Sequence, residues 1–486
     1  MHLQSKRRET RTRLAYVVVF VLCGIPIASA HENNLEVPNI ILILADDLGW
    51  TDLACFGSDF YETPHLDAFA SSGMTFKQNY SACTVCSPTR AALLTGKYPA
   101  RMHITDWIPG QMPDNPKLLV PDWIKFLPHS EITLAEVFKG AGYATASIGK
   151  WHLGTEEYYP ESQDFDVNIA GSDKSAPPSF HAPWKIPTIA EGANGEYIPD
   201  RLAEEAARFI EQSRDMPFFL YLPHFAVHTP IQGRADLVAK YRKKLQPEHK
   251  HRNVEYAAMV ESLDAAVGRV LTKLKELRLD ERTIVIFTSD NGGRITQKTT
   301  SNAPLRFGKA SAYEGGVRVP LIIRWPGVTK PASISETPVI TMDLFPTLLE
   351  IGDIAKSRTR TESGCDGLSL VPLLQQSGKL ADRDLFWHYP HHQHYQLGGT
   401  TPYAAVRSGD YKLIEFFNDM HVELYNVASD IGEQNDLAVT QSDIADRLRK
   451  RLHTWRTLVG AQMPTPNPAY DPSKPEYAAP PKAAKQ

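Results

Sequence analysis

The sequence predicts an α/β protein in which helices sandwich a large, mostly parallel β-sheet, with a smaller α+β domain toward the C-terminus. Two uninterrupted apolar runs, 39–45 and 283–288, are rich in β-branched residues, as expected of parallel strands buried on both faces. An amphipathic pattern over 254–277 predicts a long helix with one core-facing stripe. With 486 residues, 42% hydrophobic and 22% charged, the chain can bury the core that such a fold requires.

Residues 1–30 have the pattern of an export signal. A basic stretch over 6–13 precedes an apolar run over 14–23, and the small residues Ala28-Ser29-Ala30 follow. We expect cleavage to leave His31 first, in a periplasmic or extracellular protein. An uncleaved anchor or a lipoprotein attached through Cys23 is the alternative, although Leu22 before that cysteine disfavours lipidation. No other stretch approaches the roughly 20 apolar residues of a membrane span, so we do not expect an integral membrane protein.

The overall charge argues against a nucleic-acid partner. Lysine and arginine total 52 against 56 aspartates and glutamates, a net charge of −4. Such a balance provides no general basic surface for nucleic acid or for an anionic membrane. Any anion that the protein binds must therefore be held by a local site.

Polar pairs follow both apolar runs. Asp46-Asp47 ends the first, and Asp290-Asn291 follows the second. Because ligands of open α/β sheets bind at the carboxyl ends of the strands, we expect the two pairs to converge. Four oxygen-bearing side chains suit Ca²⁺ or Mg²⁺ better than zinc. A solvated turn is the alternative interpretation of either pair alone.

The other elements fit the same sandwich. Thr133 and Glu136 form a capping-box pattern that opens a helix ending near Gly140, and a strand then leads to Lys150. A further strand at 218–222 leads toward His228. The segment 155–199 is polar and rich in proline and glycine, so we expect a long surface loop over the strand ends.

A short helix with a cysteine at its start follows Cys83. Ser87 is the predicted N-cap, Pro88 the first helical residue, and Gly96 lies past the end. Cys86 would then lie at a helix N-terminus, which favours anions, with the cation of Arg90 one turn along. A buried structural cysteine is the alternative, and the Cys83–Cys86 spacing is also that of thioredoxin-like redox pairs.

The longer sequence resembles a known family. Cys86-Ser87-Pro88-Thr89-Arg90, followed by Ala-Ala-Leu-Leu-Thr-Gly, is similar to the signature of the type I, formylglycine-dependent sulfatases. Segments 142–152, 405–413 and 423–426 also resemble this family, and the C-terminal part is most similar to bacterial carbohydrate sulfatases. The resemblance implies an alkaline-phosphatase-like sandwich and hydrolysis of sulfate esters on aryl groups or saccharides.

The resemblance also implies roles for individual residues. Residue 86 would be converted from cysteine to formylglycine by a formylglycine-generating enzyme, and its hydrate would supply the nucleophile. The ligands of Ca²⁺ or Mg²⁺ would be Asp46, Asp47, Asp290, Asn291 and residue 86. The sulfate oxygens would be neutralised by Arg90, Lys150 and Lys309. His228, with Lys309, would protonate the leaving alcohol, and His152 would deprotonate the second hydroxyl of the hydrate. Around Lys309 the sequence departs from the glycine-rich family pattern at Phe307 and Ala310.

The predicted domains are a catalytic domain over 31–372, a small C-terminal domain over 373–463, and a tail over 464–486 rich in proline, alanine and lysine. A histidine cluster lies near the domain junction. It comprises His388, His391, His392 and His394, and we expect substrate contact or plain surface in preference to zinc.

Two other function classes remain open at this level. A phosphatase or phosphodiesterase of the same superfamily would share the strand-end carboxylates, but would carry Ser or Thr in place of Cys86 and more His and Asp for two zinc ions. A non-catalytic binder of sulfated glycans would retain the cations and lose the nucleophile or the metal ligands.

Overall fold

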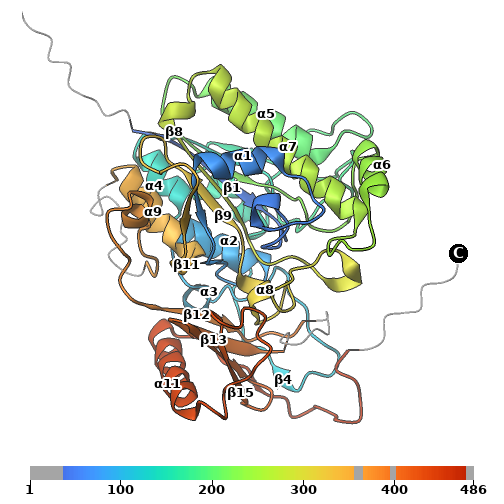
Figure 1. The fold of residues 1–486 in the computed structure, drawn as a ribbon, viewed down its shortest axis with the longest axis vertical. Coiled ribbons are helices and arrows are strands. Elements are labelled where there is room, and N and C mark those ends of the chain that lie inside the picture. Colours follow the sequence, from blue (N-terminus) through green and yellow to red (C-terminus); the bar gives the residue numbers. More distant parts are fainter. Residues whose placement is uncertain (1–36, 355–364, 394–400, 478–486) are drawn as a thin grey trace, which may run out of the picture. The chain divides into compact units, whose positions relative to one another are not determined.

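A mixed sheet of eight strands forms the centre of the protein (Figure 1). The computed structural model describes residues 37–354, 365–393 and 401–477; the predicted signal at 1–30 and His394 lie outside these ranges. In spatial order the strands are β10 (Ser333–Ser335), β2 (Met74–Phe76), β9 (Leu321–Arg324), β8 (Thr283–Ser289), β1 (Asn39–Ala45), β7 (Phe218–Pro223), β5 (Ala144–Ile148) and β6 (Val167–Ile169).

Four adjacent strands in the middle of the sheet run parallel. β1 pairs with β8 on one side and with β7 on the other, and β7 pairs with β5. β9 is antiparallel to both of its neighbours. The predicted mostly parallel α/β sandwich is therefore confirmed. Since β8, β1, β7 and β5 share one direction, the polar residues that follow them emerge at one edge of the sheet.

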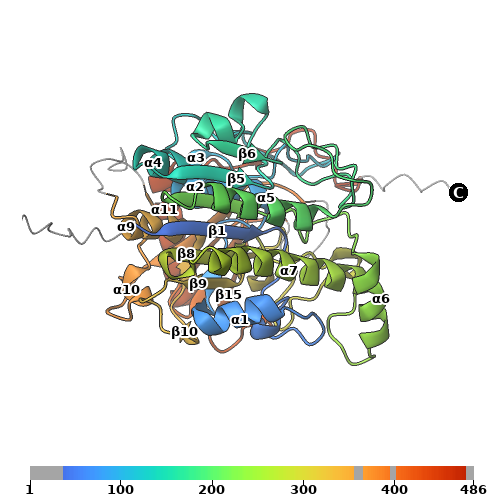
Figure 2. The ribbon, with the colours of Figure 1, turned by 90° about the horizontal axis from the view of Figure 1, so that it is seen from above.

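Alternate side chains of β1 enter two separate cores, as the two-residue repeat of a strand dictates. Ile40, Leu42 and Leu44 belong to a buried cluster with α2 (Cys86–Thr95), α4 (Leu134–Gly140) and α9 (Leu344–Ile351). Ile41 and Ile43 belong to the other cluster, with α1 (Pro64–Ser72), α5 (Ile198–Gln212) and α7 (Val254–Glu276). Figure 2 shows α5 and α7 alongside β1 and β8. Helices thus cover both faces of the sheet.

Several element boundaries match the sequence prediction and two differ. β1, β8 and α7 lie where the apolar patterns place them, and Thr133 and Glu136 form both hydrogen bonds of the capping box that begins α4. α2 begins at Cys86 with Val85 as its N-cap, so the predicted cap at Ser87 is wrong. The segment 155–199 is not wholly a loop, because β6 extends the sheet from it.

The C-terminal part is a four-stranded antiparallel sheet with a helix, the α+β arrangement that was predicted (Figure 1). Its strands are β12 (Asp384–Tyr389), β13 (Tyr403–Ser408), β14 (Tyr411–Phe416) and β15 (Val422–Asn426), and its helix is α11 (Ser442–Val459). Inner residues of this sheet, such as Trp387 and Leu413, belong to the same buried cluster as α2. The exact domain limits at 372 and 463 remain predictions.

Short elements connect these layers. They are β3 (Asn79–Tyr80), α3 (Pro99–Met102), β4 (Leu118–Leu119), α6 (Ala235–Lys244), α8 (Glu314–Val317), β11 (Val339–Ile340), α10 (Val371–Leu374) and β16 (Thr465–Pro466). β16, from the predicted tail, pairs with β4. Among the described helices, none has the length and apolar character needed to cross a membrane.

Candidate active site

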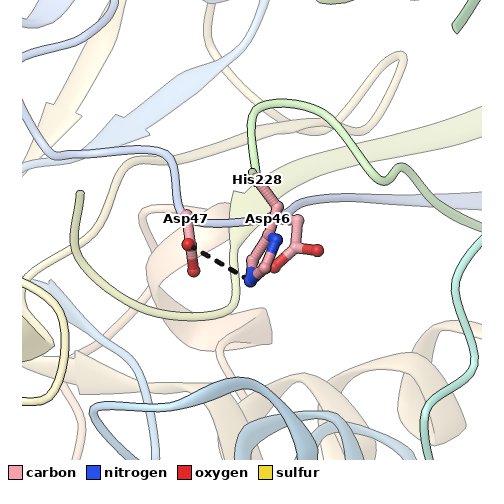
Figure 3. Close-up of side chains that lie close together, drawn as sticks. All are labelled: Asp46, Asp47 and His228. Atoms are coloured by element: carbon pink, nitrogen blue, oxygen red, sulfur yellow. Dashed lines mark ion pairs between the residues drawn. The ribbon is translucent and has the colours of Figure 1, made fainter. Parts of the chain in front are cut away.

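The polar pairs after β1 and β8 meet at the edge of the sheet. The backbone N–H of Asp47 donates to Oδ1 of Asp290 at 3.1 Å, and Nδ2 of Asn291 donates to Oδ1 of Asp47 at 2.8 Å. Asp46, Asp47 and His228 each direct a ligand atom into one small region (Figure 3). The structure thus brings together the four oxygen-bearing side chains among the five predicted metal ligands.

Two buried oxygens of this cluster are left without hydrogen-bond partners among the described residues: Oδ1 of Asp46 and Oδ1 of Asn291. A buried polar atom without a partner is costly unless something else contacts it. Sγ of Cys86 and one carboxylate oxygen each from Asp46 and Asp290 also lie within 4.8 Å of one another. These oxygen donors fit a hard cation such as Ca²⁺ or Mg²⁺.

Three cations balance the three carboxylates of the cluster. Lys150 Nζ donates to Oδ2 of Asp46 at 2.7 Å. Lys309 Nζ lies 2.7 Å from Oδ1 and 2.9 Å from Oδ2 of Asp47. The third pair is Arg90 with Asp290. All six side chains are buried, so each ion pair is held in a low-dielectric environment.

The hydrogen-bond donors of Arg90 contact Asp290 and the backbone of Lys150. Its Nε and Nη2 donate to Oδ2 of Asp290 at 3.1 and 2.7 Å, and Nη1 donates to the carbonyl oxygen of Lys150 at 3.0 Å. The resemblance assigned Arg90 to the sulfate oxygens. In this structure Arg90 holds Asp290 and the Lys150 backbone and lies 3.7 Å from Asp46, so its guanidinium is at the cluster together with the ammonium groups of Lys150 and Lys309, and the sulfate-binding role stays a prediction.

Cys86 is the first residue of α2, and only 2% of its surface is exposed. Burial raises the pKa of its thiol, and the nearby Lys150 and Lys309 oppose that shift only in part. Cys83 is also buried, and neither it nor Cys86 forms a disulfide among the described residues. An unmodified Cys86 is therefore a protonated thiol and a poor nucleophile.

Ser87 and Ile108 hold His152 next to the start of α2. The Ser87 hydroxyl donates to the carbonyl oxygen of His152 at 3.0 Å and accepts from the backbone N–H of Ile108 at 3.1 Å. Nε2 of His152 contacts the carbonyl oxygen of Ile108 at 2.5 Å. Since a carbonyl only accepts, Nε2 carries the proton of the neutral ring, and Nδ1, which has no partner among the described residues, is the basic nitrogen. Burial and the charge of Lys150 lower the pKa of His152, which keeps the ring neutral.

His228 is oriented in the opposite sense. Its Nδ1 contacts the carbonyl oxygen of Thr229 at 2.8 Å, so Nδ1 carries the proton and Nε2 faces Asp47 Oδ2 at 3.7 Å. Burial and Lys309 lower the pKa of His228 to about 3. The neutral ring is thus a proton acceptor at Nε2, and it can act as an acid only after a proton has reached that atom.

The two departures from the glycine-rich pattern around Lys309 occupy strained backbone positions. Phe307 has φ 55° and Ala310 has φ 70°, both in the left-handed region where glycine costs least. Lys309 reaches Asp47 nevertheless. The ammonium group of Lys309 therefore reaches the cluster although residues 307 and 310 are not glycine.

Burial and charge shift the acids of the cluster in opposite directions. Burial, followed by the charge of Asp46, raises the pKa of Asp290 to about 6, although Arg90 opposes the shift. Asp47 is equally buried, yet Lys309, His228 and Lys150 together hold its pKa below the usual range. Asp47 is thus the more firmly ionised of the two.

The histidine cluster does not converge on one point within the described residues. Nε2 of His388, His391 and His392 contacts three different partners, namely the Gln462 carbonyl, the Thr105 hydroxyl and the Leu118 carbonyl. All three histidines are buried, so the plain-surface expectation is wrong for them. Their separate partners also argue against a shared zinc ion.

The sequence could not reveal two features of the site. His224, at the end of β7, is fully buried with both ring nitrogens unpartnered among the described residues. Ile108 contributes only backbone atoms, which no side-chain pattern marks. The hydroxyl of Ser87 had a signal, since Ser87 follows Cys86 directly, but it was interpreted as a helix cap.

Comparison with known proteins identifies relatives along most of the chain. The sulfatase family model matches residues 38–354, and the model of the C-terminal region of N-sulphoglucosamine sulphohydrolase matches 305–457. A sulfatase of Formosa agariphila is 32% identical over 93% of this chain and 95% of its own length. The N-acetylgalactosamine-6-sulfatase of Canis lupus familiaris is 34% identical over 82% of this chain and 74% of its own. A crystal structure of Ps i-CgsB with k-i-k-neocarrahexaose superimposes with a TM-score of 0.73, at 28% identity, over 87% of this chain and 93% of that one.

The fold and the strand-end cluster define an α/β sandwich protein in which a buried cysteine lies beside an oxygen-rich group of side chains that could hold a cation. Within that class, the chain belongs to the sulfatase family. It is a sulfuric ester hydrolase, which sets aside the phosphatase and the non-catalytic binder.

Proposed function

We propose that this protein is an exported sulfatase that removes sulfate from saccharides, using a formylglycine at position 86 and Ca²⁺ or Mg²⁺. The observation that carries the proposal is that ligand atoms of Asp46, Asp290 and residue 86 lie within 4.8 Å of one another, and that buried oxygens of Asp46 and Asn291 accept no hydrogen bond from the described residues. The signal pattern at 1–30 supports export. The names of the relatives, one acting on N-acetylgalactosamine 6-sulfate and one solved with a neocarrahexaose, support a saccharide substrate.

Different residues of the chain would bind the cation, bind the sulfate and transfer protons. Asp46, Asp47, Asp290 and Asn291 would hold the cation, which supplies charge stabilisation for sulfate oxygens when bound. The ammonium groups of Lys150 and Lys309 would bind the sulfate as its negative charge grows. The proton of the attacking hydroxyl of residue 86 would go to Asp290, and the leaving alcohol would receive a proton from the Lys309 ammonium through Nε2 of His228. Nδ1 of His152 would then accept the proton of the second hydroxyl as sulfate leaves and the aldehyde forms again.

The burial of Cys86 explains why a modification is needed. As a thiol with a raised pKa, Cys86 would react slowly, and an S-sulfated cysteine would have no second hydroxyl through which sulfate could leave. Hydrated formylglycine supplies both hydroxyls. A formylglycine-generating enzyme is therefore the partner that maturation requires.

Peptide mass spectrometry tests the modification. Protein co-produced with a formylglycine-generating enzyme should carry the aldehyde at position 86 and release sulfate from 4-nitrophenyl sulfate or from a sulfated sugar. Cys86→Ala should fold but lose turnover, whereas Cys83→Ala, the neighbouring buried cysteine, should retain it. Full activity in a preparation whose peptide holds only a thiol would refute the proposed nucleophile.

Chelation tests the cation. Treatment with EDTA should abolish turnover, and Ca²⁺ or Mg²⁺ should restore it and raise the unfolding temperature of the wild type but not of Asp290→Ala. Asp166→Ala, which changes a carboxylate outside the cluster, should respond to metal like the wild type. An EDTA-treated enzyme that keeps full activity would contradict the metal assignment.

A further inference from the structure

A cavity of about 290 Å³ lies beside the candidate active site. We call it the side cavity. The residues of its lining that matter here are Asp106, Pro109, Gln111, Trp123, Lys125 and His391. They come from two loops of the main domain and from the segment after β12, so the C-terminal domain contributes one wall. The volume is near the lower end of the range for ligand sites and suits a single ring.

The side cavity begins one residue from the atoms that hold His152. Ile108 binds Nε2 of His152 through its carbonyl and the hydroxyl of Ser87 through its N–H. Pro109, the next residue, already lines the cavity. None of the cation-cluster residues lines it. The backbone at 108–109 thus joins the His152 contact to the cavity lining, and a molecule that extends from the cluster past His152 and Ile108 would reach the side cavity.

The lining combines the aromatic ring of Trp123 with an exposed polar side chain, Lys125, and buried ones, Asp106 and His391. Trp123 is half-buried, and its ring has the Lys125 ammonium 5.3 Å from the centroid and His391 edge-on at 5.5 Å. Lys125 is exposed and makes no ion pair within the described parts of the chain. An aromatic face beside hydrogen-bonding groups matches the apolar face and the hydroxyl rim of a sugar.

Asp106 is a buried acidic residue of the cavity lining. Its Oδ1 accepts from the Trp107 N–H at 2.8 Å and from the Tyr389 hydroxyl at 2.5 Å. Its Oδ2 lies 3.9 Å from Nδ1 of His391, beyond hydrogen-bond distance. Protein donors thus hold Oδ1, the backbone N–H of Gln111 also bonds to the carboxyl group, and Oδ2 lies near an imidazole nitrogen. Burial also raises the pKa of Asp106 to about 8, so this carboxyl group is largely uncharged at neutral pH.

We propose that the side cavity is a subsite for the sugar ring next to the sulfated one, with that ring against Trp123 and its hydroxyls bonded to Lys125 and Asp106. This rests on the proposed function, and it makes the substrate an oligosaccharide rather than a sulfated monosaccharide. Burying a second ring adds binding energy remote from the sulfate, which the enzyme can use at the reacting centre.

The experiment compares matched substrates on formylglycine-containing, Ca²⁺-loaded enzyme. The pairs are N-acetylgalactosamine 6-sulfate with the chondroitin 6-sulfate disaccharide, and galactose 4-sulfate with carrabiose 4-sulfate; 4-nitrophenyl sulfate reports sulfatase activity itself. In at least one pair the wild type should prefer the disaccharide. For that pair, Trp123→Ala should lower the disaccharide-to-monosaccharide ratio of kcat/KM at least tenfold, mainly through KM. Trp123→Phe should retain the ratio within threefold.

Two variants control for folding and for loss of a large side chain. Trp325→Ala removes another half-buried tryptophan, outside the side cavity, and should leave the ratio unchanged. Lys125→Met, an exposed change that should fold normally, should lower the ratio at least threefold. If the wild type cleaves sulfate esters but prefers no disaccharide, or if both Trp123→Ala and Lys125→Met keep the ratio, the subsite is refuted and the proposed function stands. Failure on every sulfate ester would refute the proposed function itself.

Discussion

Replacing Arg90 with methionine should destabilise the metal-free protein by about 3–5 kcal/mol. Arg90 is fully buried and makes three hydrogen bonds, two to Oδ2 of Asp290 and one to the Lys150 carbonyl. Methionine fills a similar volume but leaves Oδ2 of Asp290 and the carbonyl oxygen of Lys150 without the Arg90 donors. The loss is therefore that of a buried charge deprived of its partner, which is far larger than the loss of an exposed pair.

Urea unfolding in EDTA, followed by tryptophan fluorescence, measures this loss. Lys139→Met is the matched control. Lys139 lies 3.1 Å from Asp166 in an ion pair whose side chains are 42% and 41% exposed. Its loss should lower the free energy of unfolding by less than about 1 kcal/mol. Asp290→Asn combined with Arg90→Met should cost less than the sum of the single changes, by about 2 kcal/mol, because the double variant leaves no unpaired charge. If Arg90→Met costs no more than Lys139→Met, the buried pair does not form without metal and the reasoning fails.

Two further predictions concern stability away from the cation cluster. The pKa of Asp106 is about 8 in the folded protein against 3.8 normally. Between about pH 4 and pH 8 the native state therefore holds a proton that the unfolded state has released, and the free energy of unfolding should fall as the pH rises through this range. Asp106→Asn should reduce that slope by up to roughly 1.4 kcal/mol per pH unit, and equal slopes of the urea midpoint in both proteins would contradict the shift. Thr133→Ala removes the cap whose hydroxyl accepts from the Glu136 N–H and should cost about 1 kcal/mol in urea unfolding, with Thr133→Ser close to the wild type.

The sequence predicted the fold well where one local pattern decides the structure. The runs at 39–45 and 283–289 are strands because an uninterrupted apolar segment can be buried only inside a sheet covered on both faces. The polar pairs after them meet for the same reason, because parallel neighbours end at one edge. The helix pattern at 254–276 was equally decisive.

Long-range pairing explains what the sequence could not predict. Ser87 is a residue type typical of helix caps, but its hydroxyl bonds to His152 and Ile108, and the helix begins two residues earlier than predicted, at Cys86. Arg90 looked available for an anion, and only the fold shows Asp290, 200 positions away, across from it. Asp106, in the lining of the side cavity, accepts a hydrogen bond from Tyr389, a separation of 283 residues that no local pattern encodes.

The pairing of β16 with β4 has a consequence for the order in which the protein is completed. Nδ2 of Asn115 donates to the carbonyl oxygens of Asp471 and Lys474, and the strand that follows Asn115 leads directly into the loop at 120–125 that borders the side cavity. Asp471 and Lys474, which bond to Asn115, are synthesised some 350 positions after it. The cation cluster draws on residues 46–309 and can assemble earlier, whereas the wall of the cavity must wait for the end of the chain. A chain trimmed before residue 465 should therefore keep its strand-end chemistry and lose the shape of its sugar-facing wall.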